Sequence, residues 1–370
     1  MQILVTGGAG FIGSHTVDRL VEGGHCVRVL DALTSPVHRA GVPDYLNPNA
    51  EFLQGDVTRR EDLLPALGGI DAVFHFAAYQ DYLPDFSRFF QVNAAGTALL
   101  YELIVEHDLP VRKVVVASSQ SVGGEGLHRC PEGHVGVPDM RSEERLRKGR
   151  FELLCPTCGA ETTWQPSDES IANPQNPYGL SKHAEERIAL SLGDRYDIPS
   201  VAMRYSIVQG PRQSPHNAYS GACRVFCLSF LSDREPPIYE DGHQVRDFVN
   251  IHDVVDANLL VLEDARADGR VFNVGGGRAY TVAEFAGIVA SIFGKAYEPR
   301  PDGRYRFGDT RHVFSDCTAL RSLGWEPKRD AVASVSEYLV WLRDQDDLSG
   351  VLDRAEQQMR GLGVVREVMS

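Results

Sequence analysis

The chain has 370 residues, of which 43% are hydrophobic and 24% charged, and its formal net charge is −14. A chain of this length can bury a full core in one large or two closely joined domains, so a disordered protein is excluded. The acidity argues against a nucleic-acid partner, because binding to phosphates needs a broad basic surface. No apolar run approaches the ~18 residues of a membrane span, so we expect no membrane association.

The start of the chain and its cysteines indicate the compartment. Because the chain opens on the strand-like sequence MQILVTGG, we expect no leader peptide ahead of the fold. Seven cysteines, three of them close to one another along the chain, suit a reducing environment better than a set of disulfides. We therefore expect a cytoplasmic protein.

Short apolar strand patterns alternate with helical patterns through the first half of the chain. The expected strands are QILVTG (2–7), CVRVLD (26–31), AVFHFAA (72–78), KVVVASS (113–119) and PSVAMRY (199–205). This alternation predicts an α/β fold with a Rossmann-type doubly wound parallel sheet over residues 1–204. The pattern is broken at 127–166, which reads as an insertion; a smaller C-terminal α/β lobe is expected at 205–345 and a helical tail at 346–370.

The first strand is followed by the glycine-rich sequence TGGAGFIG, which carries Gly7, Gly10 and Gly13. Such a turn lets the backbone and the N-terminus of the next helix approach a diphosphate. Glycine-rich turns are common, but here a strand precedes the turn and a helical pattern follows it. Asp31 ends the second strand, where a carboxylate can bind ribose hydroxyls and repel a 2′-phosphate, so the sequence favours NAD over NADP. Asp31 taken alone could equally be a turn residue.

Tyr178 and Lys182 are spaced i,i+4 on a helix that is expected to begin at Pro177. The ammonium group of the lysine lowers the pKa of the phenol, which makes it a usable base. Ser118 and Ser119 end the strand KVVVASS, where a hydroxyl could hold a substrate oxygen beside the phenol. Each of these features is common by itself, and an ordinary amphipathic helix or a turn serine would explain it.

Taken in order, these motifs resemble those of the extended short-chain dehydrogenase/reductase superfamily, in its nucleotide-sugar epimerase/dehydratase branch. Further segments that match are NAAGTALL, RYSIVQGPRQ, RDFVNIHDVVDA, FNVGGG and RFGDTRHVFSD. The resemblance implies an NAD-binding domain at 1–204, a mainly substrate-binding lobe at 205–345, and a catalytic triad of Ser119, Tyr178 and Lys182. It implies a substrate site of Ser119, Arg246 and Arg306. The implied cofactor site is Gly7, Gly10, Phe11, Ile12, Gly13, Asp31, Asp56, Val57, Ala77, Ala78, Asn93, Ser118, Tyr178, Lys182 and Tyr205.

The implied reaction is epimerisation at C4 of a nucleotide sugar. Tyr178 would take a hydroxyl proton while the C4 hydride passes to NAD, and the 4-keto sugar would turn over before the hydride returns to its other face. Related conversions, dehydration or decarboxylation, stay open as alternatives on the same fold. So does a non-catalytic NAD sensor, although such a protein would not need the base.

Three departures from the family pattern bear on the substrate. Gln120 and Ser121 occupy the positions at which dehydratases of this branch have an acidic pair. Gly123 replaces a tyrosine of the family, and Ile207 replaces an asparagine that contacts the substrate. An apolar Ile207 indicates a deoxy sugar. The chain resembles the subgroup that contains dTDP-L-rhamnose 4-epimerases, and the resemblance also implies a homodimer.

The insertion carries a possible metal site. Cys155 and Cys158 form a C-x-x-C knuckle, and Cys130 and His134 supply a second pair, with His128 as an alternative fourth ligand. Redox-active or free thiols are the other interpretations. We expect a structural zinc ion in a zinc-ribbon-like loop, because a long polar excursion has too little apolar surface to order itself.

Overall fold

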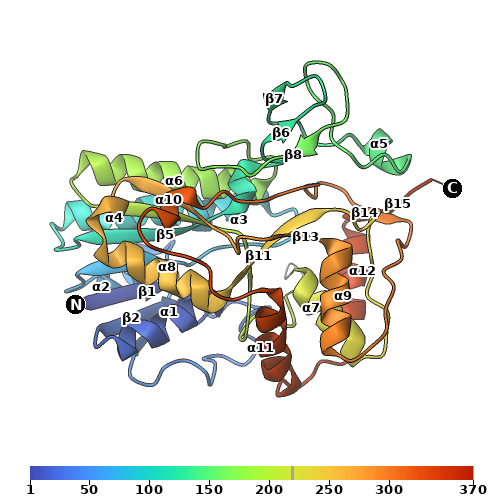
Figure 1. The fold of residues 1–370 in the computed structure, drawn as a ribbon. Helices are drawn as coiled ribbons and strands as arrows, with labels where there is room; N and C mark the ends of the chain where they lie inside the picture. The colour runs from blue at the N-terminus through green and yellow to red at the C-terminus, as the bar shows by residue number, and fades with distance from the viewer. Residues whose placement is uncertain (218–220, 370) are drawn as a thin grey trace.

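A computed structural model describes residues 1–217 and 221–369 (Figure 1). Its centre is a seven-stranded sheet in the order β12-β9-β5-β4-β1-β2-β3, in which all neighbouring strands are parallel. The strands are β1 (Gln2–Thr6), β2 (Cys26–Asp31), β3 (Glu51–Gln54), β4 (Ala72–His75), β5 (Lys113–Ser119), β9 (Ser200–Tyr205) and β12 (Arg270–Val274).

Helices cover both faces of this sheet, as the buried apolar strands require. Ile3 and Val5 of β1 face one layer, whereas Leu4 between them faces the other. The first layer contains α1 (Phe11–Glu22), α8 (Ile251–Glu263) and α10 (Thr318–Arg321). The second contains α2 (Arg60–Ala66), α4 (Gly96–Glu106) and α6 (Pro177–Arg195), with α3 (Phe86–Phe89) and the π-helix η1 (Phe90–Ala95) leading into α4.

The smaller lobe has its own core. A mixed sheet of β10 (Ile207–Gln209), β11 (Val245–Asn250) and β13 (Ala279–Thr281) packs with α7 (Ala222–Leu231), α9 (Val282–Ile292) and α11 (Ala331–Arg343). Two further elements, α12 (Val351–Gly361) and β15 (Val365–Glu367), follow, and β15 pairs with β14 (Arg304–Arg306). Short 3-10 turns lie at η2 (Gln120–Gly123) and η3 (Ala265–Ala267).

The expected boundaries hold only in part. The five strands predicted from the first half of the chain are all present, but the sheet takes its last strand, β12, and its covering helix α8 from beyond residue 204. A division at 204 is therefore wrong for the sheet. The tail at 346–370 contains the helix α12, in agreement with the expected helical tail, and the short strand β15 follows it.

The insertion folds as a small unit that stands away from the main sheet (Figure 1). It has three short antiparallel strands, β6 (His128–Arg129), β7 (Val135–Gly136) and β8 (Thr163–Trp164), and the helix α5 (Glu143–Arg147). The tail reaches it, because the backbone N–H of Met369 donates to the carbonyl of Arg147 at 2.8 Å. Across the described parts of the chain, we find no helix that is both long and apolar enough to cross a membrane.

Candidate active site

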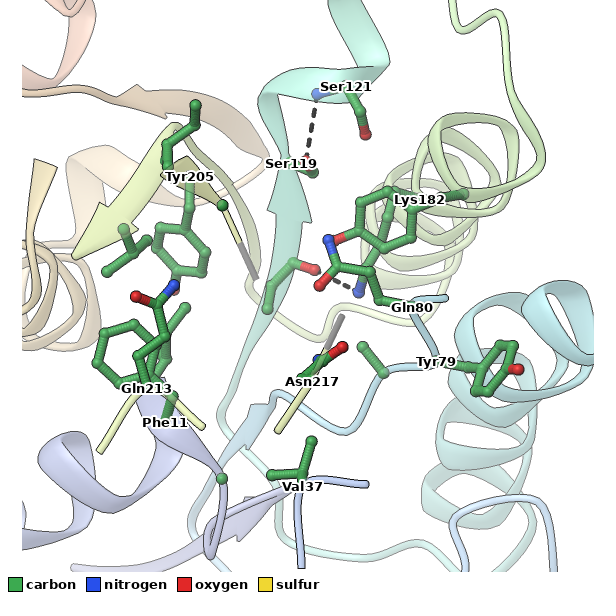
Figure 2. A pocket seen from close by; sticks show the side chains of 18 of the residues that line it. Phe11, Val37, Tyr79, Gln80, Ser119, Ser121, Lys182, Tyr205, Gln213 and Asn217 are labelled. Carbon is green, nitrogen blue, oxygen red and sulfur yellow. Dashed lines mark hydrogen bonds between the residues drawn. The ribbon is translucent and has the colours of Figure 1, made fainter. Parts of the chain in front are cut away.

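A cavity of about 720 Å³ lies between the carboxyl ends of the large sheet and the smaller lobe. Its walls contain residues from both, and Figure 2 shows Phe11 and Tyr205 on one side and Lys182 and Tyr79 on the other. Of the residues expected to bind cofactor or substrate, all but Asn93 line this cavity. Their convergence places one long site at the end of the sheet where ligands bind in open α/β folds.

The glycine turn packs too closely to accept side chains. A Cβ on Gly13 would lie 2.2 Å from the carbonyl oxygen of Gly7. Gly7 has φ +67°, and its own Cβ would lie 2.6 Å from the backbone nitrogen of Ala77, which lies just after β4. Helix α1 begins directly after Gly10, so its N-terminal N–H groups face the cavity that the turn borders. This arrangement fits a diphosphate group.

Asp31 is held at the far end of this turn. Its carboxylate accepts hydrogen bonds from the backbone N–H groups of Ala9 at 3.0 Å and Leu33 at 2.9 Å, and only 8% of the residue is exposed. His38 lies against it, with 3.8 Å between the Nε2 and Oδ1 atoms. His38 lines the same cavity and was not predicted, because a lone histidine in a loop carries no pattern.

Helix α6 presents the tyrosine and lysine. Asn176 caps the helix by accepting a hydrogen bond from the N–H of Gly179 at 2.8 Å, and Pro177 occupies the first turn. Lys182 Nζ donates to the Ala117 carbonyl at 2.6 Å, which fixes it against β5 (Figure 2). Burial raises the pKa of Tyr178, while the charge of Lys182 and a hydrogen bond with Ser119 lower it.

Glu185 is a part of this site that the sequence did not reveal. Its Oε2 atom accepts a hydrogen bond from Lys182 Nζ at 2.6 Å, and both side chains are almost completely buried. Among the described residues, its Oε1 atom has no hydrogen-bond partner. Burial raises the pKa of Glu185 to about 7 against the opposing effect of Lys182.

Two expected cofactor residues have other roles in the fold. Asn93 is fully buried and does not reach the cavity; it accepts from the N–H of Tyr79 at 2.7 Å and donates to Ser181 Oγ at 2.9 Å. The expectation of direct cofactor contact is therefore corrected to one of support, tying η1 to α6. Ser118 borders the cavity, but its hydroxyl donates to Glu186 at 2.5 Å.

The two arginines lie on the smaller-lobe side of the cavity. Arg246 donates to the carbonyls of Arg311 at 3.0 Å and Thr310 at 2.9 Å, so its guanidinium group is fixed by backbone. Arg306 lies over the Tyr239 ring, with 4.9 Å from its Cζ atom to the ring centroid. A pair of guanidinium groups in a cavity suits phosphate oxygens.

The positions that depart from the family pattern are also near the triad. Gln120 and Ser121 line the cavity just after Ser119, and the N–H of Ser121 donates to Ser119 Oγ at 3.2 Å. Ile207 lines the cavity from β10, whereas Gly123 is not among the lining residues. The wall beside Ser119 is thus neutral, and Ile207 adds an apolar surface.

The four predicted metal ligands come together in the insertion. Sulfur and nitrogen atoms are separated by 3.4 Å between Cys130 and His134, 3.8 Å between Cys155 and His134, and 3.7 Å between the sulfurs of Cys158 and Cys130. A tetrahedral zinc site with bonds of about 2.0–2.3 Å has edges of roughly 3.4–3.8 Å, which these three separations match, and all four ligand atoms lie within 4.8 Å of one another. His128 is not part of the cluster: it bonds Thr162 and the Glu125 carbonyl instead.

Comparisons with known proteins point in one direction. A family model described as "NAD dependent epimerase/dehydratase family" matches residues 3–141 and 155–275. A dTDP-L-rhamnose 4-epimerase of Burkholderia thailandensis is 32% identical over 353 residues, covering 94% of this chain and 96% of that protein. The UDP-glucose 4-epimerase of Thermotoga maritima, solved with UDP-glucose, is 31% identical with a TM-score of 0.75, covering 93% of this chain and 99% of that one. The Thermus thermophilus UDP-glucose 4-epimerase, solved with NAD, is 27% identical with a TM-score of 0.72, covering 93% and 99%.

Proposed function

Because the chain belongs to the NAD-dependent epimerase/dehydratase family, we propose that it is a nucleotide-sugar 4-epimerase that uses NAD. The observation that carries the proposal is the meeting of Ser119, Tyr178 and Lys182 at one cavity, between the glycine turn and the two arginines. A cofactor and a nucleotide sugar need adjoining sites of this kind, because the hydride must pass between them.

The cofactor would lie along the large sheet. The turn at Gly7, Gly10 and Gly13 leaves room for a diphosphate, because it has no Cβ atoms that would collide with the backbone. The carboxylate of Asp31 would accept hydrogen bonds from the ribose hydroxyls. When bound, NAD+ supplies the acceptor for the hydride of the sugar carbon and its donor on return. These residues bind and orient the group.

The triad would remove the proton of the C4 hydroxyl and later return it. Tyr178 would take the hydroxyl proton at C4, and Lys182 favours the phenolate electrostatically. Ser119, hydrogen-bonded to Tyr178, would hold the reacting oxygen. After the 4-keto sugar has turned over, Tyr178 would return the proton to the oxygen of the epimer.

Epimerisation is favoured over dehydration by the wall beside Ser119. Gln120 and Ser121 offer an amide and a hydroxyl there, and neither can act as the acid that expels a C6 hydroxyl. Ile207 favours a substrate with a methyl group at C6. For this reason, and because of the similarity to the Burkholderia enzyme, we propose a deoxy-sugar nucleotide such as dTDP-L-rhamnose.

Proton NMR in deuterated water with a panel of UDP-, dTDP-, GDP- and CDP-sugars tests the proposal. The C4 epimer should form with no deuterium in the sugar ring, because the hydride never exchanges with solvent. Tyr178→Phe, with matched shape and no hydroxyl, should slow turnover by about 10²–10⁴-fold. Deuterium at C3 or C5 would show enolisation and contradict a simple 4-epimerase, as would a lack of turnover with every sugar.

The insertion would be ordered by zinc. Hydrogen bonds, the strongest from the backbone N–H of Cys158, lower the pKa of Cys155 to about 6 against the opposing effect of desolvation, so a thiolate is available near neutral pH. Four protein ligands leave no open position, which makes the ion structural and separate from the hydride chemistry. We assign Cys130, His134, Cys155 and Cys158 as its ligands.

The protein would work in the cytoplasm as a homodimer. Phe86 of α3 and Phe90 of η1 are 57% and 40% exposed, and Leu180 of α6 is 46% exposed. These elements pack against one another on one side of the large domain. Exposed apolar side chains gathered in this way favour a second copy as the partner.

A further inference from the structure

A buried ionic network joins the insertion to the wall of the cavity. Arg311 is fully buried. Its guanidinium group donates to Glu152 of the insertion at 3.0 Å and to Glu240 at 2.9 Å and Asp241 at 2.7 Å in the smaller lobe. Arg141, also of the insertion, donates to the same oxygen of Glu240 at 2.8 Å. Glu240 lines the cavity, so the network reaches the site itself.

The same groups hold the backbone segment 309–311, whose carbonyls accept hydrogen bonds from the Arg246 guanidinium group. Arg141 donates to the Asp309 carbonyl at 2.8 Å, and the N–H of Arg311 donates to Glu125 at 2.6 Å. Between these two anchors lies Thr310, whose carbonyl, with that of Arg311, fixes the Arg246 guanidinium group. A displacement of residues 309–311 would therefore move Arg246.

The chemistry of the network makes it stiff. Hydrogen bonds between ions are shorter and stronger than neutral ones, and a buried arginine that loses a carboxylate is left with an uncompensated charge. Burial raises the pKa of Glu152, but hydrogen bonds from His312 and Arg311 outweigh this effect and lower it to about 2. Glu152 is thus an anion at every pH at which the enzyme would work.

We propose that Arg141 and Glu152 of the insertion are positioning residues for the nucleotide-diphosphate wall, acting through Arg311, Glu240 and the 309–311 backbone on Arg246. The inference rests on the proposed function. The insertion then raises the affinity for the nucleotide sugar. It does not change the affinity for NAD, since the glycine turn and Asp31 are not in the network.

The test uses Glu152→Gln in the full-length, NAD-loaded protein, with UDP and dTDP as calorimetric probes. Nucleoside-diphosphate binding should weaken by at least about tenfold, because a misplaced guanidinium group loses its phosphate contacts. The KM for the nucleotide sugar should rise by a similar factor while kcat stays within about twofold and bound NAD is retained. Glu152→Asp, which keeps the charge on a shorter side chain, should fall between this variant and wild type.

Glu144→Gln is the matched control. Glu144 lies in the same insertion, but its ion pair with Lys148 is exposed, so the same chemical change should leave diphosphate affinity unaltered. If Glu152→Gln bound UDP and dTDP with wild-type affinity, the inference would be overturned but the proposed function would stand. Equal losses of NAD and nucleotide affinity would also overturn it, since they would indicate general damage to the fold. Wild-type protein that binds neither UDP nor dTDP and converts no nucleotide sugar would overturn the proposed function, and the inference with it.

Discussion

The carboxylate of Glu185 lies 2.6 Å from the ammonium nitrogen of Lys182, and both groups are almost completely buried. A lysine that serves to favour a phenolate is thus partly neutralised by an anion on its own helix. The carboxylate raises the pKa of Tyr178, whereas Lys182 lowers it. The pair therefore sets the pH at which Tyr178 can act as a base.

Replacing Glu185 with Gln should move the acidic limb of the pH–rate profile to lower pH. Above pH of about 7, where Glu185 is ionised, the substitution removes a negative charge, so the pKa of Tyr178 falls and the phenolate becomes available at lower pH than in wild type. Glu185 also interacts with three other ionisable groups. Glu186 raises the pKa of Glu185, and Glu185 raises the pKa of Tyr101 on α4 and of Tyr205 on β9. Burial raises the pKa of both tyrosines, which therefore stay neutral across this range. The measurement is kcat/KM against pH; Glu185→Asp, which keeps the charge, should stay near wild type, and a limb that moved upward would refute this account.

Gly13→Ala should destabilise the protein by roughly 1–3 kcal/mol and reduce NAD binding. The new Cβ would lie 2.2 Å from the Gly7 carbonyl oxygen, so the turn must shift. Gly287→Ala is the control on another helix, α9, where a Cβ meets nothing within 4 Å. That change should stabilise by about 0.5–1 kcal/mol. Urea denaturation gives both values, and equal effects at the two sites would count against the close packing of the turn.

Cys155→Ser should abolish stoichiometric zinc, measured by plasma emission spectrometry on purified protein. A serine hydroxyl is a poor replacement for a thiolate, and the remaining three ligands cannot close the site. Cys26→Ser, at an exposed cysteine outside the cluster, should leave the zinc content at its wild-type value. Unchanged zinc in Cys155→Ser would show that the ion is bound elsewhere or that the cluster holds none.

If the protein forms the proposed dimer, Phe90→Asp should convert it to a monomer in analytical ultracentrifugation. A carboxylate on that apolar face would have to be buried without a partner in the interface. Val340 is 65% exposed on α11 of the smaller lobe, so Val340→Asp introduces the same charge far from the proposed contact and should leave the dimer intact. If wild type sediments as a monomer, the homodimer is wrong.

Local patterns in the sequence predicted the strands and the helix that carry the candidate site, whereas the roles of its residues came from the order of the motifs and the family resemblance. The strands that carry Asp31 and Ser119 are short and mostly apolar, and the i,i+4 spacing of Tyr178 and Lys182 places them on one face of a helix. The four predicted metal ligands were identified from spacing within one segment, and the structure places them together. The positions of these strands, of the helix and of the cysteine cluster could each be predicted from a few neighbouring residues.

The features that were missed depend on contacts between distant segments. Strand β12 has an ordinary apolar pattern, and only its pairing with β9 assigns it to the large sheet. Glu185 is a charged residue in a polar stretch of helix, where a periodic pattern predicts exposure, but its face of α6 packs on β5 and β9. Arg141 and Arg311 share Glu240 although they are far apart in the chain.

Strand β12 follows the other strands of the large sheet in the sequence, so it is the last of them to be synthesised. While the ribosome has synthesised only the first five expected strands, β9 has no neighbour on its outer side, and its row of backbone donors and acceptors is open to pairing with another nascent chain. That edge closes only once Val274 has left the exit tunnel. Expression of the NAD-binding half by itself, cut at residue 204, should therefore yield aggregates, whereas a chain that includes β12 and α8 can complete its sheet.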